Sequence, residues 1–136
     1  MGVFGYLSTL PSFLLWLAVM SAIMAAYTFV YTRFVTPFDE LALIRAGNVA
    51  AAVSLTGAKV GFVAVLFSVA TSALSVVDLI SWSIIGLVVQ IAAFYLAKAL
   101  HGELVVQIEK GSIAAGLWLA TFNLVAGLIQ AACMVY

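Results

Sequence analysis

The chain has 136 residues, of which 67% are hydrophobic and 7% are charged. A soluble domain carries roughly 25% charged residues, so this sequence has too few of them to cover a water-facing surface. Its zero net charge excludes a basic nucleic-acid-binding face, and its single histidine and single cysteine exclude a paired-histidine metal site and an intrachain disulfide. The composition predicts an all-α integral membrane protein with one membrane domain over residues 1–136.

Four apolar runs have the length of about 20 residues that a membrane-spanning helix needs. The predicted spans cover residues 12–32, 47–70, 79–97 and 111–136. The N-terminal stretch has no Lys or Arg ahead of the first run, whereas a cleaved signal peptide begins with a positively charged region. We therefore expect the first helix to stay in the mature protein.

The few cationic side chains predict the orientation of these spans. Those outside the spans lie in or beside the first and third connections, at Arg33, Arg45, Lys98 and Lys110. The positive-inside rule then assigns both connections to the cytoplasm and both termini to the outer, periplasmic side. Each cytoplasmic connection is compatible either with a short amphipathic helix at the membrane surface or with an ordinary polar loop.

The sequence also repeats itself at an offset of 64 residues. Residues 44–51 match residues 108–115, with the shared pattern I-x-x-G-[N/S]-x-A-A. This predicts two tandem copies, about residues 12–72 and 76–136, each forming a two-helix hairpin. Because each hairpin crosses the membrane twice, both copies are expected to have the same orientation and to form a parallel repeat.

Each copy contains a glycine followed by a residue that favours a helix start, Asn48 in the first copy and Ser112 in the second. A side-chain oxygen there accepts a hydrogen bond from a free backbone N–H of the first turn. We interpret both residues as helix caps. The alternative is a weak anion site formed by the two helix N-termini.

Several motifs resemble one family of membrane proteins. They are the doubled I-x-x-G-[N/S]-x-A-A unit, the run Thr36-Pro37-Phe38-Asp39-Glu40, the pair Gly57 and Gly61, and the ending at residues 131–136. Together they resemble the domain of unknown function 350 family, small bacterial inner-membrane proteins of the YjfL type. The resemblance spans nearly the whole chain and implies a bacterial inner-membrane location, with a phage-shock-type membrane-remodelling protein as partner class. Lys59 and Gln130 depart from the family pattern, which has an apolar residue and Asn there.

Polar side chains inside a span are costly unless they are buried against protein or water. At helical spacing, the second span carries Thr56 and Lys59 on one face, and the fourth carries Asn123 and Gln130 on the face that corresponds by the repeat. Gln90 of the third span is a further candidate. We expect the second and fourth helices to face each other, or symmetry mates, along this intramembrane polar stripe, with Lys59 opposite Asn123.

Lys59 lies near the middle of its span, and the five carboxylates are all expected in loops or at helix ends. It is then either largely neutral and hydrogen-bonded, or next to a wet cavity or pore. A polar contact in a helix bundle or an oligomer interface is the alternative. Tyr31 and Tyr95 are interpreted as anchors at the inner interface.

The sequence contains no nucleophile paired with a base, no metal cluster and no cofactor motif, so we expect neither an enzyme nor a cofactor. Two hypotheses remain, with lipid and further copies of the chain as partners in both. One is an oligomeric ion or small-solute channel or carrier subunit that uses the polar stripe. The other is a non-conducting scaffold that recruits a membrane-stress partner through cytoplasmic loop residues Asp39, Glu40, Arg45, Glu103, Glu109 and Lys110.

Overall fold

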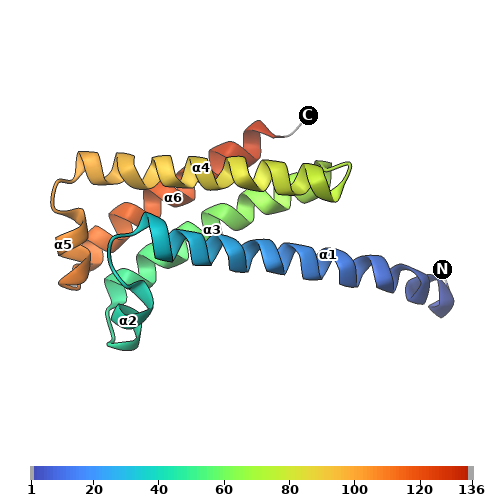
Figure 1. Ribbon diagram of the computed structural model, residues 1–136, viewed down its shortest axis with the longest axis horizontal. Helices are drawn as coiled ribbons and strands as arrows, with labels where there is room; N and C mark the ends of the chain where they lie inside the picture. Colours follow the sequence, from blue (N-terminus) through green and yellow to red (C-terminus); the bar gives the residue numbers. More distant parts are fainter. Residues whose placement is uncertain (1, 135–136) are drawn as a thin grey trace.

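The computed structural model describes residues 2–134 of the chain, and these residues contain helices and no strand (Figure 1). The elements in chain order are α1 (Val3–Val30), the single π-helical turn η1 (Tyr31–Val35), α2 (Glu40–Arg45), α3 (Val49–Ser72), α4 (Val76–Leu100), α5 (Leu104–Glu109) and α6 (Ile113–Cys133). Four of them, with η1 extending α1, are long and apolar enough to cross a membrane. This confirms, for the described residues, the predicted all-α fold with four helices able to span a membrane.

The first span differs most from its prediction, because α1 begins at Val3 instead of near Ser12 and contains Pro11. Proline removes one backbone N–H from the helix ladder, which costs less than exposing a whole segment of unpaired backbone to lipid. The helix therefore continues through it. The predicted fourth span reaches Tyr136, and its last two residues lie outside the described part of the chain.

The first and third connections each contain a six-residue helix, α2 and α5. The glycines that follow them, Gly47 and Gly111, both have φ of 88°, a left-handed conformation that strains any residue with a side chain. The next residues cap the long helices. Asn48 accepts a hydrogen bond from the third N–H of α3 at 3.0 Å, and Ser112 does the same for α6 at 3.4 Å.

The centre of the bundle is the contact between α3 and α6, which both begin at the α2/α5 end and run in the same direction (Figure 1). Glycines allow this close approach, because a Cβ added to any of them would collide with the facing helix. The facing pairs are Gly116 with Ala50, Gly57 with Ala120, and Gly61 with both Asn123 and Gly127. Van der Waals packing of small residues thus holds the two helices together.

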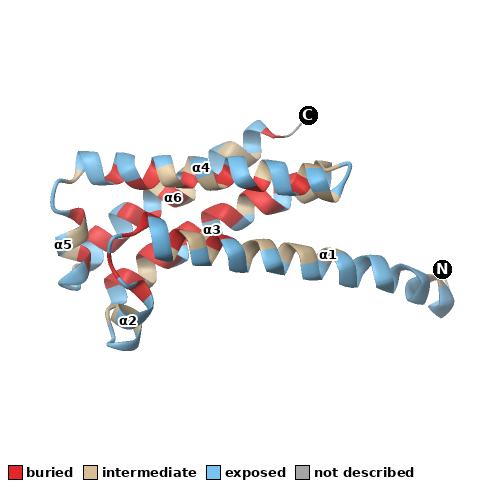
Figure 2. Cartoon of the chain, viewed as in Figure 1, coloured by how far each residue is buried: buried red, intermediate tan, exposed pale blue. Residues whose placement is uncertain are grey.

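The other two long helices, α1 and α4, lie beside this pair. Burial is concentrated on α3, on the inner faces of α4 and α6 and at the C-terminal end of α1, whereas the N-terminal half of α1 is exposed (Figure 2). The contact of α1 with the bundle includes Tyr27, which stacks on Phe62 with ring centroids 3.8 Å apart and donates a hydrogen bond to the Ala58 carbonyl at 3.0 Å. The core is therefore richest at the α2/α5 end.

Candidate functional site

Glu40 begins α2 and is 1% exposed, and neither of its carboxylate oxygens has a hydrogen-bond partner among the described residues. Its neighbour Asp39 behaves differently, since that exposed carboxylate caps α2 by accepting a hydrogen bond from the Ala42 N–H at 3.1 Å. The requirement to cap α2 explains the position of Asp39. It does not explain a buried acid one residue later.

Burial raises the pKa of Glu40 to about 7, because removal from water penalises the charged carboxylate. The nearby Thr36 hydroxyl lowers this pKa without forming a hydrogen bond to either oxygen, the neighbouring Asp39 carboxylate raises it, and Lys59 lowers it, each by less than burial does. Glu40 therefore binds and releases a proton near neutral pH. That property is typical of groups that transfer protons in proteins.

Tyr31 lies at the start of η1 and is fully buried. In this wider turn the Thr36 N–H donates to the Tyr31 carbonyl at 3.1 Å, five residues back along the chain. The Tyr31 hydroxyl accepts a hydrogen bond from the Asn123 side-chain amide of α6 at 2.9 Å. Because the hydroxyl oxygen is the acceptor in that bond, its own proton is available for another acceptor.

Two glutamines continue the polar contacts from Asn123. The Gln90 amide of α4 donates to the Asn123 backbone carbonyl at 3.1 Å, and the side-chain oxygens of both residues have no partner. Gln130 lies seven residues after Asn123 on the same side of α6, a rise of roughly 10 Å, and its side-chain polar atoms lack partners as well. It lies next to Gly86 of α4.

The polar line consists of five residues: Glu40, Tyr31, Asn123, Gln90 and Gln130. It begins at α2 and reaches the last turn of α6. Every buried side-chain nitrogen or oxygen without a partner in residues 2–134 belongs to this set. Each such atom costs roughly 1–3 kcal/mol, and buried polar groups of this kind ordinarily bind water or an ion. The residues of the polar line are suited to hydrogen bonding and proton exchange. Residues 2–134 contain no cluster of three His, Cys, Asp or Glu side chains that could hold a metal ion.

The structure corrects the predicted face of α3. Lys59 lies in a groove between α1 and α3, away from Asn123, and Thr56 is exposed. The residue that meets Asn123 is Gly61. The reason is steric, because the closest approach of two helices selects the face with Gly57 and Gly61 over a face with longer side chains. Thr56 and Lys59 of α3 are therefore turned away from α6, while Asn123 of α6 is turned inward.

The predicted partner-binding residues divide into two groups. Glu40 is buried, so the prediction that it contacts a soluble partner is wrong for this arrangement. The other five are exposed at the α2/α5 end: Asp39, Arg45, Glu103, Glu109 and Lys110.

Sequence reasoning missed the burial of Glu40 and Tyr31. At the 64-residue offset Glu40 corresponds to Leu104, which is fully buried. The pairing of a carboxylate with a leucine at equivalent repeat positions is a signal that the sequence does contain. Tyr31 offers no such signal, because its counterpart Tyr95 is 54% exposed and was interpreted, like Tyr31, as an interfacial anchor.

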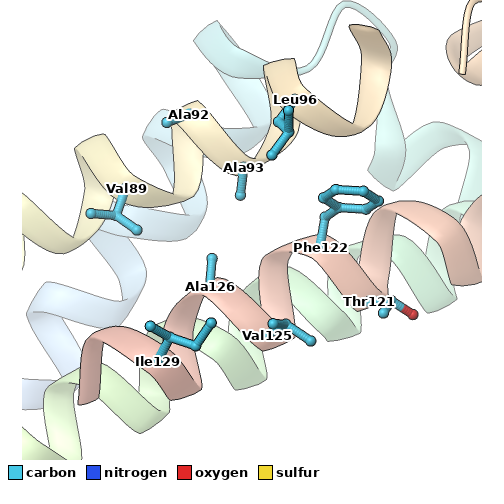
Figure 3. A pocket seen from close by; sticks show the side chains of 9 residues that line it. All are labelled: Val89, Ala92, Ala93, Leu96, Thr121, Phe122, Val125, Ala126 and Ile129. Atoms are coloured by element: carbon cyan, nitrogen blue, oxygen red, sulfur yellow. The ribbon is translucent and has the colours of Figure 1, made fainter. Parts of the chain in front are cut away.

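A separate groove of about 500 Å³ lies between α4 and α6 (Figure 3). Its lining is apolar apart from the Thr121 hydroxyl, so it matches a lipid chain better than a polar solute. Figure 3 shows side chains from both helices around it: Val89, Ala92, Ala93, Leu96, Thr121, Phe122, Val125, Ala126 and Ile129. The polar line does not contribute to it.

Comparison with known proteins agrees with the resemblance seen in the sequence. Residues 5–134 match the family model described as Domain of Unknown Function (DUF350). The chain is 32% identical over 130 residues to the UPF0719 inner membrane protein YjfL of Escherichia coli K12, covering 96% of this chain and 98% of that protein. The protein of the same name from Escherichia coli O157:H7 matches equally, and no solved structure matches. With the four apolar helices, these relatives support a multi-pass inner-membrane location. The chain belongs to the DUF350 family.

Proposed function

We propose that this protein is a proton-conducting channel or carrier subunit of the inner membrane, with the polar line as its path. The observation that carries the proposal is that the partnerless buried polar atoms of the described residues belong to only four side chains, of which Gln90 is hydrogen-bonded to Asn123 and Asn123 to Tyr31. A proton suits it better than a larger solute, because none of the five grooves described in the structure is lined by Gln90, Asn123 or Gln130.

Each group has a distinct part in this proposal. Glu40 takes up a proton at the α2/α5 end, since its pKa of about 7 lets it load and unload at cellular pH. The Tyr31 hydroxyl is the next group and is held by Asn123. The amides of Gln90, Asn123 and Gln130 do not titrate, so they act by orienting water molecules that carry the proton onward.

The test is proton flux in liposomes that contain the purified full chain and a trapped pH-sensitive dye, driven by a potassium diffusion potential. We expect the wild type to conduct above protein-free liposomes. Glu40→Gln removes the titrating group with little change in shape, so we expect its flux to fall to the protein-free rate.

The matched control is Glu109→Gln, which removes an exposed carboxylate at the same end and should conduct like the wild type. Lys59→Leu should also conduct, because Lys59 lies outside the polar line. A wild type that conducts no better than empty liposomes, or a Glu40→Gln protein with full flux, would refute the proposal.

We further propose that the two hairpins are tandem copies of parallel orientation and that their α2/α5 end faces the cytoplasm. The similarity of the two loops supports the first point, because α2 and α5 have the same length and both following glycines share one φ value. The positive-inside rule supports the second. A homo-oligomer is proposed as well, supported by the exposed apolar N-terminal half of α1.

The scaffold hypothesis also has a specific observation in its favour. The Asn48 side-chain amide donates to the Ile108 carbonyl at 2.8 Å, so the two loops are joined into one surface. Its exposed charges are those of Asp39, Arg45, Glu103, Glu109 and Lys110. A phage-shock-type membrane-remodelling protein is the proposed partner, and neither hypothesis involves catalysis or a cofactor. Co-purification that persists after charge reversal of all five residues would refute this role.

A further inference from the structure

The groove that contains Lys59 has a volume of about 450 Å³ and opens beside α1 and α3. Its wall changes in character from Met24 and Ala25 of α1, which are apolar, to Thr32 of η1, which is polar. Leu41 of α2 contributes to its α2/α5 end. The groove thus combines an apolar part at mid-helix depth with a polar part near one membrane surface.

A second hollow of about 350 Å³ shares Phe29, Thr32 and Leu41 with this groove, so the two depressions adjoin. The second hollow is lined by Arg33 of η1 and also by Asp39. One continuous surface therefore holds two cationic side chains, Lys59 and Arg33, and one exposed carboxylate.

Lys59 requires an explanation because of its depth. The hydrogen bond from Tyr27 to the Ala58 carbonyl places this part of α3 level with the apolar interior of α1. No carboxylate of residues 2–134 forms an ion pair with the Lys59 ammonium group. A lysine at this depth directs its ammonium group along the helix toward the nearer surface, here the α2/α5 end.

We propose that this groove binds one anionic phospholipid from the leaflet on the α2/α5 side. The phosphate lies between Lys59 and Arg33, and an acyl chain follows Met24 and Ala25. Charge complementarity selects an anionic lipid, because a phosphatidylglycerol headgroup adds no cation next to the two side chains, whereas a choline headgroup does. Basic pockets between membrane helices bind anionic headgroups by the same physics. This proposal does not depend on proton conduction.

The test is native mass spectrometry of the full chain from detergent containing equal amounts of phosphatidylglycerol and phosphatidylcholine. We expect the wild type to retain one phosphatidylglycerol in preference to phosphatidylcholine. Loss of one cationic contact is worth about 1 kcal/mol, so Lys59→Gln should reduce phosphatidylglycerol retention about fivefold. Lys59→Arg should keep it, which separates the effect of charge from the effect of changing the residue.

Lys98→Gln is the matched control, since Lys98 is an exposed lysine at the same end of the bundle that lines neither hollow. Arg33→Gln gives a second, independent test of the same site, and we expect a similar loss of retention. Equal retention of the two lipids by the wild type would overturn the proposal. So would undiminished retention in both Lys59→Gln and Arg33→Gln, or a groove occupied by a second copy of the chain or by another protein.

Discussion

Glu40 shows how a single residue can keep a protein sensitive to pH. Its carboxyl group is buried without a partner, so the neutral form is tolerated and the ionised form is costly. The Asp39 carboxylate next to it is exposed and caps a helix. The two adjacent acids therefore have different surroundings, because Glu40 is buried and Asp39 is exposed.

The first prediction concerns pH-dependent stability. The pKa of Glu40 rises from 4.5 to about 7 on folding, so between these values the unfolded chain loses a proton that the folded chain keeps. The free energy of unfolding should therefore fall as the pH rises through this window, by up to about 1.4 kcal/mol per pH unit, and level off above it. Denaturant unfolding in detergent from pH 5 to 8 measures this.

Glu40→Gln should remove most of that slope and be more stable than the wild type at pH 8, whereas Glu109→Gln should keep the wild-type slope. If Glu40→Gln and the wild type share one pH profile, the assignment of the raised pKa to this residue is wrong.

The second prediction is a double-mutant cycle on the hydrogen bond from Asn123 to Tyr31. Tyr31→Phe leaves the buried Asn123 amide without this partner and should cost about 1–3 kcal/mol. Asn123→Leu removes the donor and keeps the backbone atoms of Asn123 that face Gly61. Since both single changes break the same bond, the double variant should lose less than the sum by at least about 0.5 kcal/mol. Strict additivity in chemical unfolding would show that the bond contributes nothing.

At the scale of elements, the bundle depends on two devices, the glycine contact between α3 and α6 and the caps that begin these helices. The first sets how closely the helices approach. The second sets where each helix starts, because a left-handed glycine ends the short helix and a polar side chain then begins the long one.

The third prediction tests the helix contact. A Cβ at Gly127 would meet the Gly61 backbone, which cannot move aside without separating α3 from α6. Gly127→Ala should lower the free energy of unfolding by about 1–3 kcal/mol, as overpacking does in other cores. The control is Gly102→Ala, where a Cβ meets nothing within 4 Å, and its effect should be within about 0.5 kcal/mol. Equal effects of the two substitutions would contradict the contact.

The fourth prediction compares the two caps. Asn48→Ala removes the cap of α3 and also the 2.8 Å bond to the Ile108 carbonyl of the other loop, so it should cost about 2 kcal/mol. Ser112→Ala removes one longer bond of 3.4 Å and should cost about 0.5 kcal/mol. Thermal unfolding of both variants in one detergent measures the difference. A larger loss for Ser112→Ala would reverse the ranking.

Over the whole molecule, the two hairpins are similar in structure but carry different side chains at equivalent positions. Where the first copy has Glu40 the second has Leu104, and where the first has Lys59 the second has Asn123. The buried acid and the groove with Lys59 therefore both belong to the first hairpin, while the second supplies amides to the core.

The fifth prediction concerns assembly. The N-terminal half of α1 packs little against the rest of the chain, and we expect a further copy to cover it (Figure 2). Light scattering in mild detergent should then give a protein mass that is a multiple of 14.3 kDa. A protein mass of one chain at all concentrations would contradict the oligomer.

Much of the fold could be predicted, and less of the site. Membrane spans follow from local composition, so three of the four long helices lie within a few residues of their predicted ranges. The start of α1 was predicted too late, because the helix continues through Pro11. The α6 half of the polar stripe faces inward as expected, at Asn123. The α3 half of the stripe does not face inward. The spacing of Thr56 and Lys59 shows that they share one face of α3, but it does not show whether that face meets α6.

The amino-acid sequence alone is enough to predict that the chain lies in a membrane, which four segments form its long helices, and which residues carry its charges and cap α3 and α6. These are local properties, set by hydrophobicity over some 20 residues and by backbone preferences at single positions. The burial of Glu40, the bond from Asn123 to the buried Tyr31 and the outward position of Lys59 follow only from the way the helices pack. The rotation of each helix depends on which faces pack most closely, and in this bundle that choice belongs to the glycines of α3 and α6.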